Sequence, residues 1–213
     1  MKTAAIIIGC WEEHTHNPTI VQCYERILNT IYRDSAIETV WLSANHLSVL
    51  PEDWYQNSKQ IFVDECGVDW VRRAFTQRSC TGYATASNLI VQQKFNGKPR
   101  LLVWDGWQIE YLLNYTFAHI ERLHYFGIGW DTGVKRDPVG WGHACDLIKH
   151  KHIQPREIVA SEDCVLSNIT QPSDFSTKSL RDFRSAEFDK PNVAQHNWQL
   201  VDSVYTKQDL DWF

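Results

Sequence analysis

The pattern of apolar residues near the amino terminus restricts the fold more than any other feature of this sequence. A continuous apolar run at Ala4–Ile8 is typical of a strand that is covered on both faces. Pro18 then begins a stretch with apolar residues at helical spacing, and a second strand-like run follows at Glu38–Leu42. Strand, helix and strand in this order form a β-α-β unit, which needs a right-handed crossover and parallel strands. The sequence therefore predicts a parallel sheet.

The alternation of strands and helices continues along the body of the chain. Further strands are expected at Leu101–Trp104, Leu123–Gly127 and Glu157–Ala160. Helices are expected at Glu52–Ser58 and Gly140–His150, whereas Thr85–Gln92 fits a strand or a helix equally well. Such alternation predicts an α/β fold of three layers, in which a doubly wound, mostly parallel sheet lies between two layers of helices.

The pattern of alternating strands and helices ends near Asn168. We expect residues 1–168 to form one α/β domain. Residues 169–213 follow this domain and show no clear periodicity of apolar residues, although Trp198–Asp202 fits a strand. This part is interpreted as an extended C-terminal arm that packs on its own domain or on a partner subunit. Its aromatic side chains must be buried to offset the entropy lost on ordering, so we expect self-association or membership of a larger assembly.

Composition excludes some classes of partner. The formal net charge is −5, so the sequence gives no reason to expect binding to nucleic acid or to an anionic membrane. No segment is long and apolar enough to cross a bilayer. The six Cys residues include no CxxC pair, which favours reduced thiols in a cytoplasmic protein over a disulfide framework.

A block in the second half of the chain carries a recognisable order of elements. It runs through a strand ending at Gly127, a glycine-containing turn at residues 129–133, a helix through Cys145 and a strand that ends in Glu162 and Asp163. In this respect the chain resembles the isochorismatase-like cysteine hydrolases, a family that includes nicotinamidases. The resemblance covers residues 4–168 in the order of elements, and it implies the same α/β fold.

The resemblance also implies where catalytic groups would stand. The family uses an Asp after the first strand as a base, a Lys after a middle strand that favours the thiolate, and a Cys nucleophile at a helix start. These positions fall at or beside Gly9, near Trp104 or Asp105, and at Gly133. Glycine has no side chain that attacks or accepts a proton. We therefore expect no catalytic residue of the thiol mechanism and no cofactor.

Ligands of parallel sheets bind at the carboxyl ends of the strands. The residues expected in such a cleft are Trp11, Glu12, His46, Trp104, Asp105, Trp107, Trp130, Asp131 and Gly133. The indoles of Trp104, Trp107 and Trp130 either form an aromatic cage for a flat or cationic ligand or fill the space left by catalytic groups. His14, His16 and His46 are metal candidates, but solvated loop histidines explain them more simply.

Three functions stay open at this point. The first is a catalytically degenerate member of this family that acts as a binding or structural component of an assembly. The second is a hydrolase of a small amide-type molecule that uses acid–base or metal-assisted chemistry in the same cleft. The third is a generic α/β sheet with an unrelated ligand. The ten Trp residues, the short chain and the altered site also suggest a viral protein, which would act in the virion or the host cytoplasm.

Overall fold

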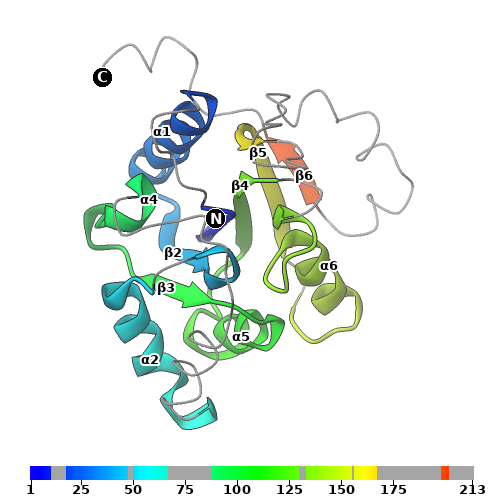
Figure 1. The fold of residues 1–213 in the computed structure, drawn as a ribbon. Helices are drawn as coiled ribbons and strands as arrows, with labels where there is room; N and C mark the ends of the chain where they lie inside the picture. Colours follow the sequence, from blue (N-terminus) through cyan, green and yellow to red (C-terminus); the bar gives the residue numbers. More distant parts are fainter. Residues whose placement is uncertain are drawn as a thin grey trace.

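The computed structural model describes residues 1–10, 18–47, 50–66, 88–129, 133–154, 156–166 and 198–201. Within these ranges the chain forms a six-stranded sheet in the order β3-β2-β1-β4-β5-β6, and all neighbouring strands are parallel (Figure 1). The strands are β1 (Thr3–Ile8), β2 (Ile37–Ser43), β3 (Arg100–Val103), β4 (Arg122–Ile128), β5 (Glu157–Leu166) and β6 (Trp198–Val201). The strand order reverses between β1 and β4, which is the switch point of a doubly wound sheet.

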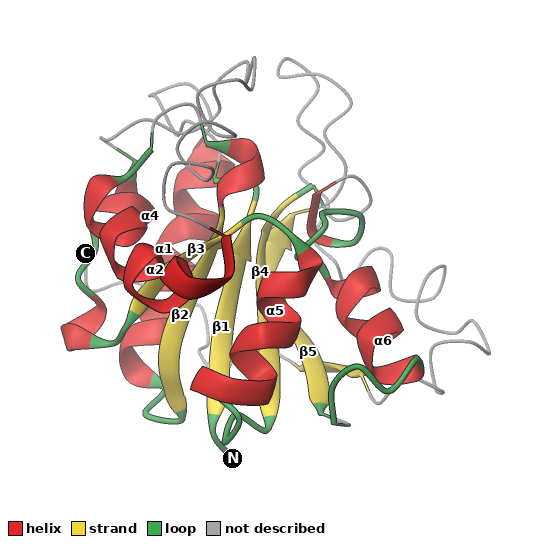
Figure 2. Ribbon diagram, turned by 90° about the horizontal axis from the view of Figure 1, so that it is seen from below, coloured by secondary structure: helices red, strands yellow, loops and turns green. Residues whose placement is uncertain are grey.

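Helices cover both faces of the sheet (Figure 2). On one face lie α1 (Pro18–Arg33) and α4 (Leu89–Gln92). On the other lie α5 (Gly106–Tyr111), its π-helical continuation η3 (Leu112–Thr116) and α6 (Trp141–Lys149). The remaining elements are α2 (Glu52–Cys66) beside β3, and the 3-10 turns η1 (Ala44–His46) and η2 (Phe95–Gly97). The predicted α/β class with helices on both faces is thus confirmed.

The central strands are largely buried because helices cover both of their faces. All six residues of β1 are buried, which explains the uninterrupted run that the sequence shows. Trp41 of β2 packs against Phe117 after η3, with ring centroids 5.8 Å apart. On the other face, α1 presents a buried stripe at helical spacing that includes Ile20, Tyr24 and Ile27.

The edge strand β3 is covered by side chains of α2. The Ser58 hydroxyl accepts a hydrogen bond from the Leu102 amide at 2.6 Å and donates to the Leu102 carbonyl at 3.1 Å. The Asn57 amide donates to the Arg100 carbonyl at 3.0 Å. An edge strand otherwise presents unpaired backbone groups that invite pairing with another chain. α2 therefore closes this edge of the sheet.

The strand predictions are confirmed, with differences at the ends of elements. β3 ends at Val103, so Trp104 directly follows it, and β5 continues beyond Ala160 to Leu166. The ambiguous stretch before Gln92 contains a helix from Leu89, while residues 85–87 lie outside the described part. The strand expected at Trp198 is present as β6, which pairs with β5. No helix in the described ranges is long and apolar enough to cross a membrane.

Candidate functional site

A candidate site lies at the carboxyl ends of the central strands β1 and β4. Gly9 follows β1 with φ of 70°, and Gly129 follows β4 with φ of 78°. Both lie in the left-handed region that favours glycine. Just before this point β4 approaches β1 so closely that a Cβ on Gly127 would lie 1.8 Å from the Ile8 carbonyl oxygen. Glycine at 127 therefore allows the two strands to meet at the switch point.

Asp137 links three segments at this edge of the sheet. Its carboxylate is 4% exposed and accepts hydrogen bonds from Ser43 Oγ at 2.9 Å, Asn45 Nδ2 at 3.0 Å and the Val139 amide at 2.9 Å. The same Asn45 amide donates to the Trp104 carbonyl at 3.1 Å. The ends of β2 and β3 and the loop after β4 are thus held by one buried polar network. This residue was missed from the sequence, where the turn signal Asp-Pro was the available clue.

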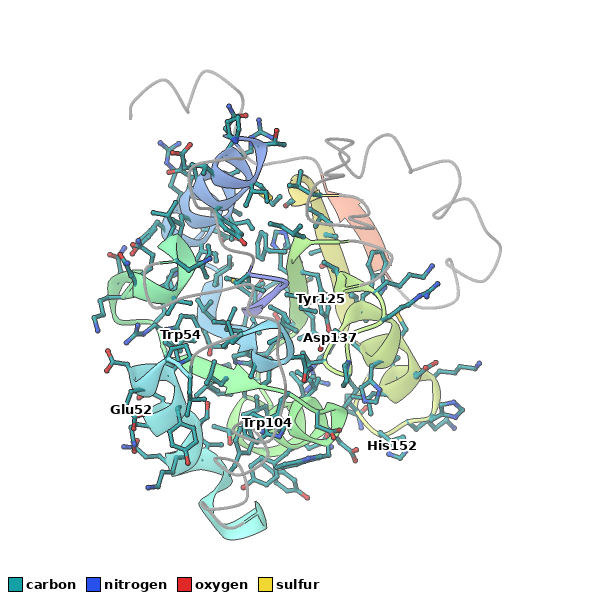
Figure 3. All side chains as sticks on the ribbon, viewed as in Figure 1. Glu52, Trp54, Trp104, Tyr125, Asp137 and His152 are labelled. Atoms are coloured by element: carbon teal, nitrogen blue, oxygen red, sulfur yellow. The ribbon has the colours of Figure 1, made fainter. Side chains whose placement is uncertain are left out.

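Tyr125 of β4 lies beside this network. Its hydroxyl donates to the Val139 carbonyl at 3.3 Å, and Figure 3 shows Tyr125 and Asp137 together between the sheet and α6. Burial raises the pKa of Tyr125 well above its usual value, and Cys145 and Asp137 raise it further. The phenol therefore stays protonated and acts as a hydrogen-bond donor.

The described thiols are poorly placed for nucleophilic chemistry. Cys10, Cys23, Cys145 and Cys164 are buried and form no disulfide. Burial raises the pKa of Cys145 to about 12, and the thiolate, not the thiol, is the nucleophile. Reduced, buried thiols were expected, and these four agree with that expectation; Cys80 and the side chain of Cys66 lie outside the described part.

Three buried polar atoms without a partner among the described residues come from the turn after β3, from α5 and from α6. Gln108 is fully buried, and its Oε1 accepts hydrogen bonds from the amides of Trp104 at 2.7 Å and Asp105 at 3.2 Å. This pairing fixes the orientation of the side-chain amide. Within the described residues, Gln108 Nε2, Trp104 Nε1 and His143 Nε2 are buried without a hydrogen-bond partner. A buried polar group without a partner costs about 1–3 kcal/mol, so a hydrogen-bond partner supplied by a ligand or by water would be stabilising.

His143 lies directly against this turn. Its imidazole packs on Gly106 at the start of α5, where a Cβ would lie 1.7 Å from Nε2. Glycine at 106 therefore lets α6 approach α5. The sequence placed His143 in a helix, which is confirmed, but gave no signal for its contact with α5.

Two of the predicted cage residues pack on a common neighbour. The rings of Trp104 and Trp107 meet Phe62 of α2 edge-on, with centroids 6.1 and 5.5 Å away. Trp104 is 8% exposed. This arrangement favours the space-filling interpretation for these two indoles. Trp130 lies outside the described residues, so the cage stays a prediction.

The other predicted site residues are placed as follows. Asp105 precedes α5, and Gly133 begins the loop that carries Asp137, whose amide donates to the Gly133 carbonyl at 2.8 Å. His46 ends η1, and its side chain is not described. Trp11, Glu12, His14, His16 and Asp131 lie outside the described ranges. Among the side chains that are described, no three His, Cys, Asp or Glu residues form a group able to hold a metal ion.

Comparison with known proteins gives no assignment. No family model matches the sequence, and no curated protein or solved structure is significantly similar to it.

Proposed function

We propose that this chain is a catalytically degenerate relative of the isochorismatase-like cysteine hydrolases and acts as a binding or assembly component. The observation that carries the proposal is the identity of the residues at the catalytic positions implied by the resemblance. Gly9 follows β1, Trp104 and Asp105 follow β3, and Gly133 follows β4. The first position therefore lacks a base, the second lacks a cation and the third lacks a nucleophile. The buried, protonated thiol of Cys145 supports the same conclusion.

The ligand that suits this site is a small molecule rich in hydrogen-bond acceptors. Gln108 Nε2 and Trp104 Nε1 are donors only, and both are buried near the carboxyl end of β3 without a partner among the described residues. A ligand carbonyl or carboxylate would pair them at the edge of the sheet where parallel α/β proteins bind their ligands.

Ammonia release from nicotinamide tests the absence of thiol chemistry. We expect the purified chain to release no more ammonia than buffer does, before and after treatment with iodoacetamide. Ammonia release that is lost when one Cys is alkylated would overturn the proposal.

An acid–base hydrolase is the second candidate, and the contact between Ser43 Oγ and the buried Asp137 carboxylate at 2.9 Å favours it. A carboxylate that accepts a hydroxyl proton is the arrangement that activates a weak nucleophile. Ammonia release that survives alkylation but disappears in Asp137→Asn, with folding retained, would select this candidate over the first.

Self-association belongs to the proposed role as an assembly component. Light scattering on the full chain at micromolar concentration measures it directly. We expect a mass above that of one chain, and a monodisperse monomer would remove this part of the proposal.

A further inference from the structure

A hollow lies at the opposite end of β3 from Trp104. It has a volume of about 450 Å³ and lies between α2 and the segment that leads into β3. Its lining residues include the cationic Lys94, Lys98 and Arg100, the polar Gln60 and the apolar Ile61. Among the residues that the structure describes, no carboxylate lines it. The hollow is separate from the carboxyl edge of the sheet.

A left-handed turn brings two of these cations to one wall. Phe95, Asn96 and Gly97 have φ values of 47°, 53° and 79°, a conformation that is costly for residues other than glycine. Phe95 is held in it by burial, because its ring stacks on Tyr32 with centroids 5.6 Å apart. The Gly97 amide donates a hydrogen bond to the Lys94 carbonyl at 3.1 Å, and this bond closes the turn. Lys94 and Lys98 flank the turn and both line the hollow.

Arg100 also lines the hollow, and its guanidinium is held in place by several contacts. The Arg100 side chain is 11% exposed. The guanidinium carbon Cζ lies 5.4 Å from the ring centroid of Trp54, which Figure 3 labels. Its Nη1 donates to the Gln93 carbonyl at 2.8 Å. Its Nη2 donates to the Asp53 carboxylate at the longer distance of 3.5 Å. Much of its donor capacity is therefore not used by a carboxylate.

Positive charge exceeds the negative charge in contact with it. Asp53 is bound to Lys94 at 2.6 Å and is shared with Arg100. The Lys98 ammonium instead donates to the neutral carbonyls of Asp34 at 3.1 Å and Ile37 at 2.5 Å. Among the described residues, Lys94 and Arg100 thus share one carboxylate, and the Lys98 ammonium donates to neutral carbonyls. Burial lowers the pKa of Lys98, although the more distant charges of Asp34 and Glu38 oppose this. An anion in the hollow would stabilise that charge.

We propose that this hollow binds a small organic molecule that carries a phosphate group. The phosphate oxygens accept hydrogen bonds from the free N–H groups of Lys94, Lys98 and Arg100. A volume of about 450 Å³ is larger than a bare phosphate needs and lies in the range of small-molecule sites. Ile61 supplies an apolar wall for the organic part.

Calorimetric titration of the full chain with inorganic phosphate and with phenyl phosphate tests the proposal. We expect phenyl phosphate to bind more tightly than inorganic phosphate, and the affinity for both to fall as the NaCl concentration is raised.

Lys94→Gln should weaken binding of phenyl phosphate by roughly threefold, because an exposed charge contributes modestly. Asp53→Asn should tighten it by about the same factor, because it removes the competing carboxylate. Lys98→Met, checked for folding by thermal unfolding, should weaken binding by roughly tenfold or more.

The control variant is Lys149→Gln, at the exposed end of α6, which removes the same net charge away from the hollow. Equal weakening by Lys149→Gln and Lys94→Gln would mean that binding is nonspecific and would overturn the proposal. Absence of binding at millimolar phenyl phosphate would do the same. Equal affinity for the two ligands would overturn the organic part of the proposal and leave a bare anion site.

Discussion

The buried carboxylate of Asp137 is the single group that joins most segments at the carboxyl edge of the sheet. Its oxygens accept from Ser43, Asn45 and Val139. Asp137→Asn places an amide where these donors converge, so at least one of them loses its acceptor. We expect the free energy of unfolding to fall by about 2–3 kcal/mol in urea titrations. Asp146→Asn, on the exposed side of α6, is the control and should change it little.

His124 makes the stability of the fold depend on pH. It is 3% exposed, its ring stacks on Phe126, and Nε2 lies 2.8 Å from Ser161 Oγ. Burial, with a smaller effect of Arg122, lowers its pKa to about 3, whereas an unfolded His has a pKa of about 6.5. The unfolded chain therefore binds a proton first as the pH falls. Stability supplied by neutral His124 is complete above the unfolded pKa and is lost between about pH 6.5 and 3.

Urea titrations at pH 7 and pH 5 measure this contribution when the chain is compared with His124→Gln, whose amide can still bond to Ser161. We expect the natural chain to lose about 2 kcal/mol more than the variant over this interval. Other groups that titrate between pH 5 and pH 7 are present in both chains, so their contribution to stability cancels in the comparison. Equal losses would show that His124 does not remain neutral in the folded protein.

The sequence located part of the site but not its polar network. Trp104, Asp105 and Gly133 follow strands of a parallel sheet, so their position at one edge was predictable from the alternation of elements. Asp137 and Gln108 were not predictable in this way, because their roles depend on partners brought near by tertiary folding. Asp137 meets Ser43 across a separation of 94 residues. Local patterns carry no information on such a contact.

Gly127 controls how β1 and β4 meet at the switch point. Its φ is 137°, and a Cβ would lie 1.8 Å from backbone of β1. Gly97 also has a positive φ, of 79°, but has open space around it. We expect Gly97→Ala to cost about 1 kcal/mol of unfolding free energy. Gly127→Ala should cost several times more or prevent folding, because rigid backbone must shift. Thermal unfolding of the two variants measures the difference, and similar melting temperatures would contradict it.

The ends of elements were harder to predict than their existence. The sequence predicted a strand at Glu157–Ala160, in a block whose last strand ends in Glu162 and Asp163, whereas β5 runs from Glu157 to Leu166. β5 continues because Ser161 is buried and its hydroxyl bonds to His124 of β4. A polar residue inside a strand is tolerated when a neighbouring strand supplies the partner. That partner is a tertiary feature, so the extension was not visible in the local pattern.

At the scale of the whole molecule, the two edges of the sheet differ. α2 covers the edge strand β3 through Asn57 and Ser58, whereas β6 is the last strand at the other end and pairs with β5 from Ile158 to Ser161. The alternating elements predicted a parallel sheet, but not which strands are neighbours, since apolar patterns do not encode strand order. The pairing of Trp198–Val201 with β5 shows that this stretch of the chain completes the sheet.

Removing β6 should therefore expose the edge of β5. A chain that ends at Asn197 lacks the strand, whereas one that ends at Asp202 keeps it. Four residue pairs join β5 to β6, and at about 0.5–1.5 kcal/mol for each net hydrogen bond the shorter chain should be less stable by about 2–4 kcal/mol. Thermal unfolding of the two chains at equal concentration measures the difference. A shorter chain with the same melting temperature as the longer one would show that β6 contributes no stability.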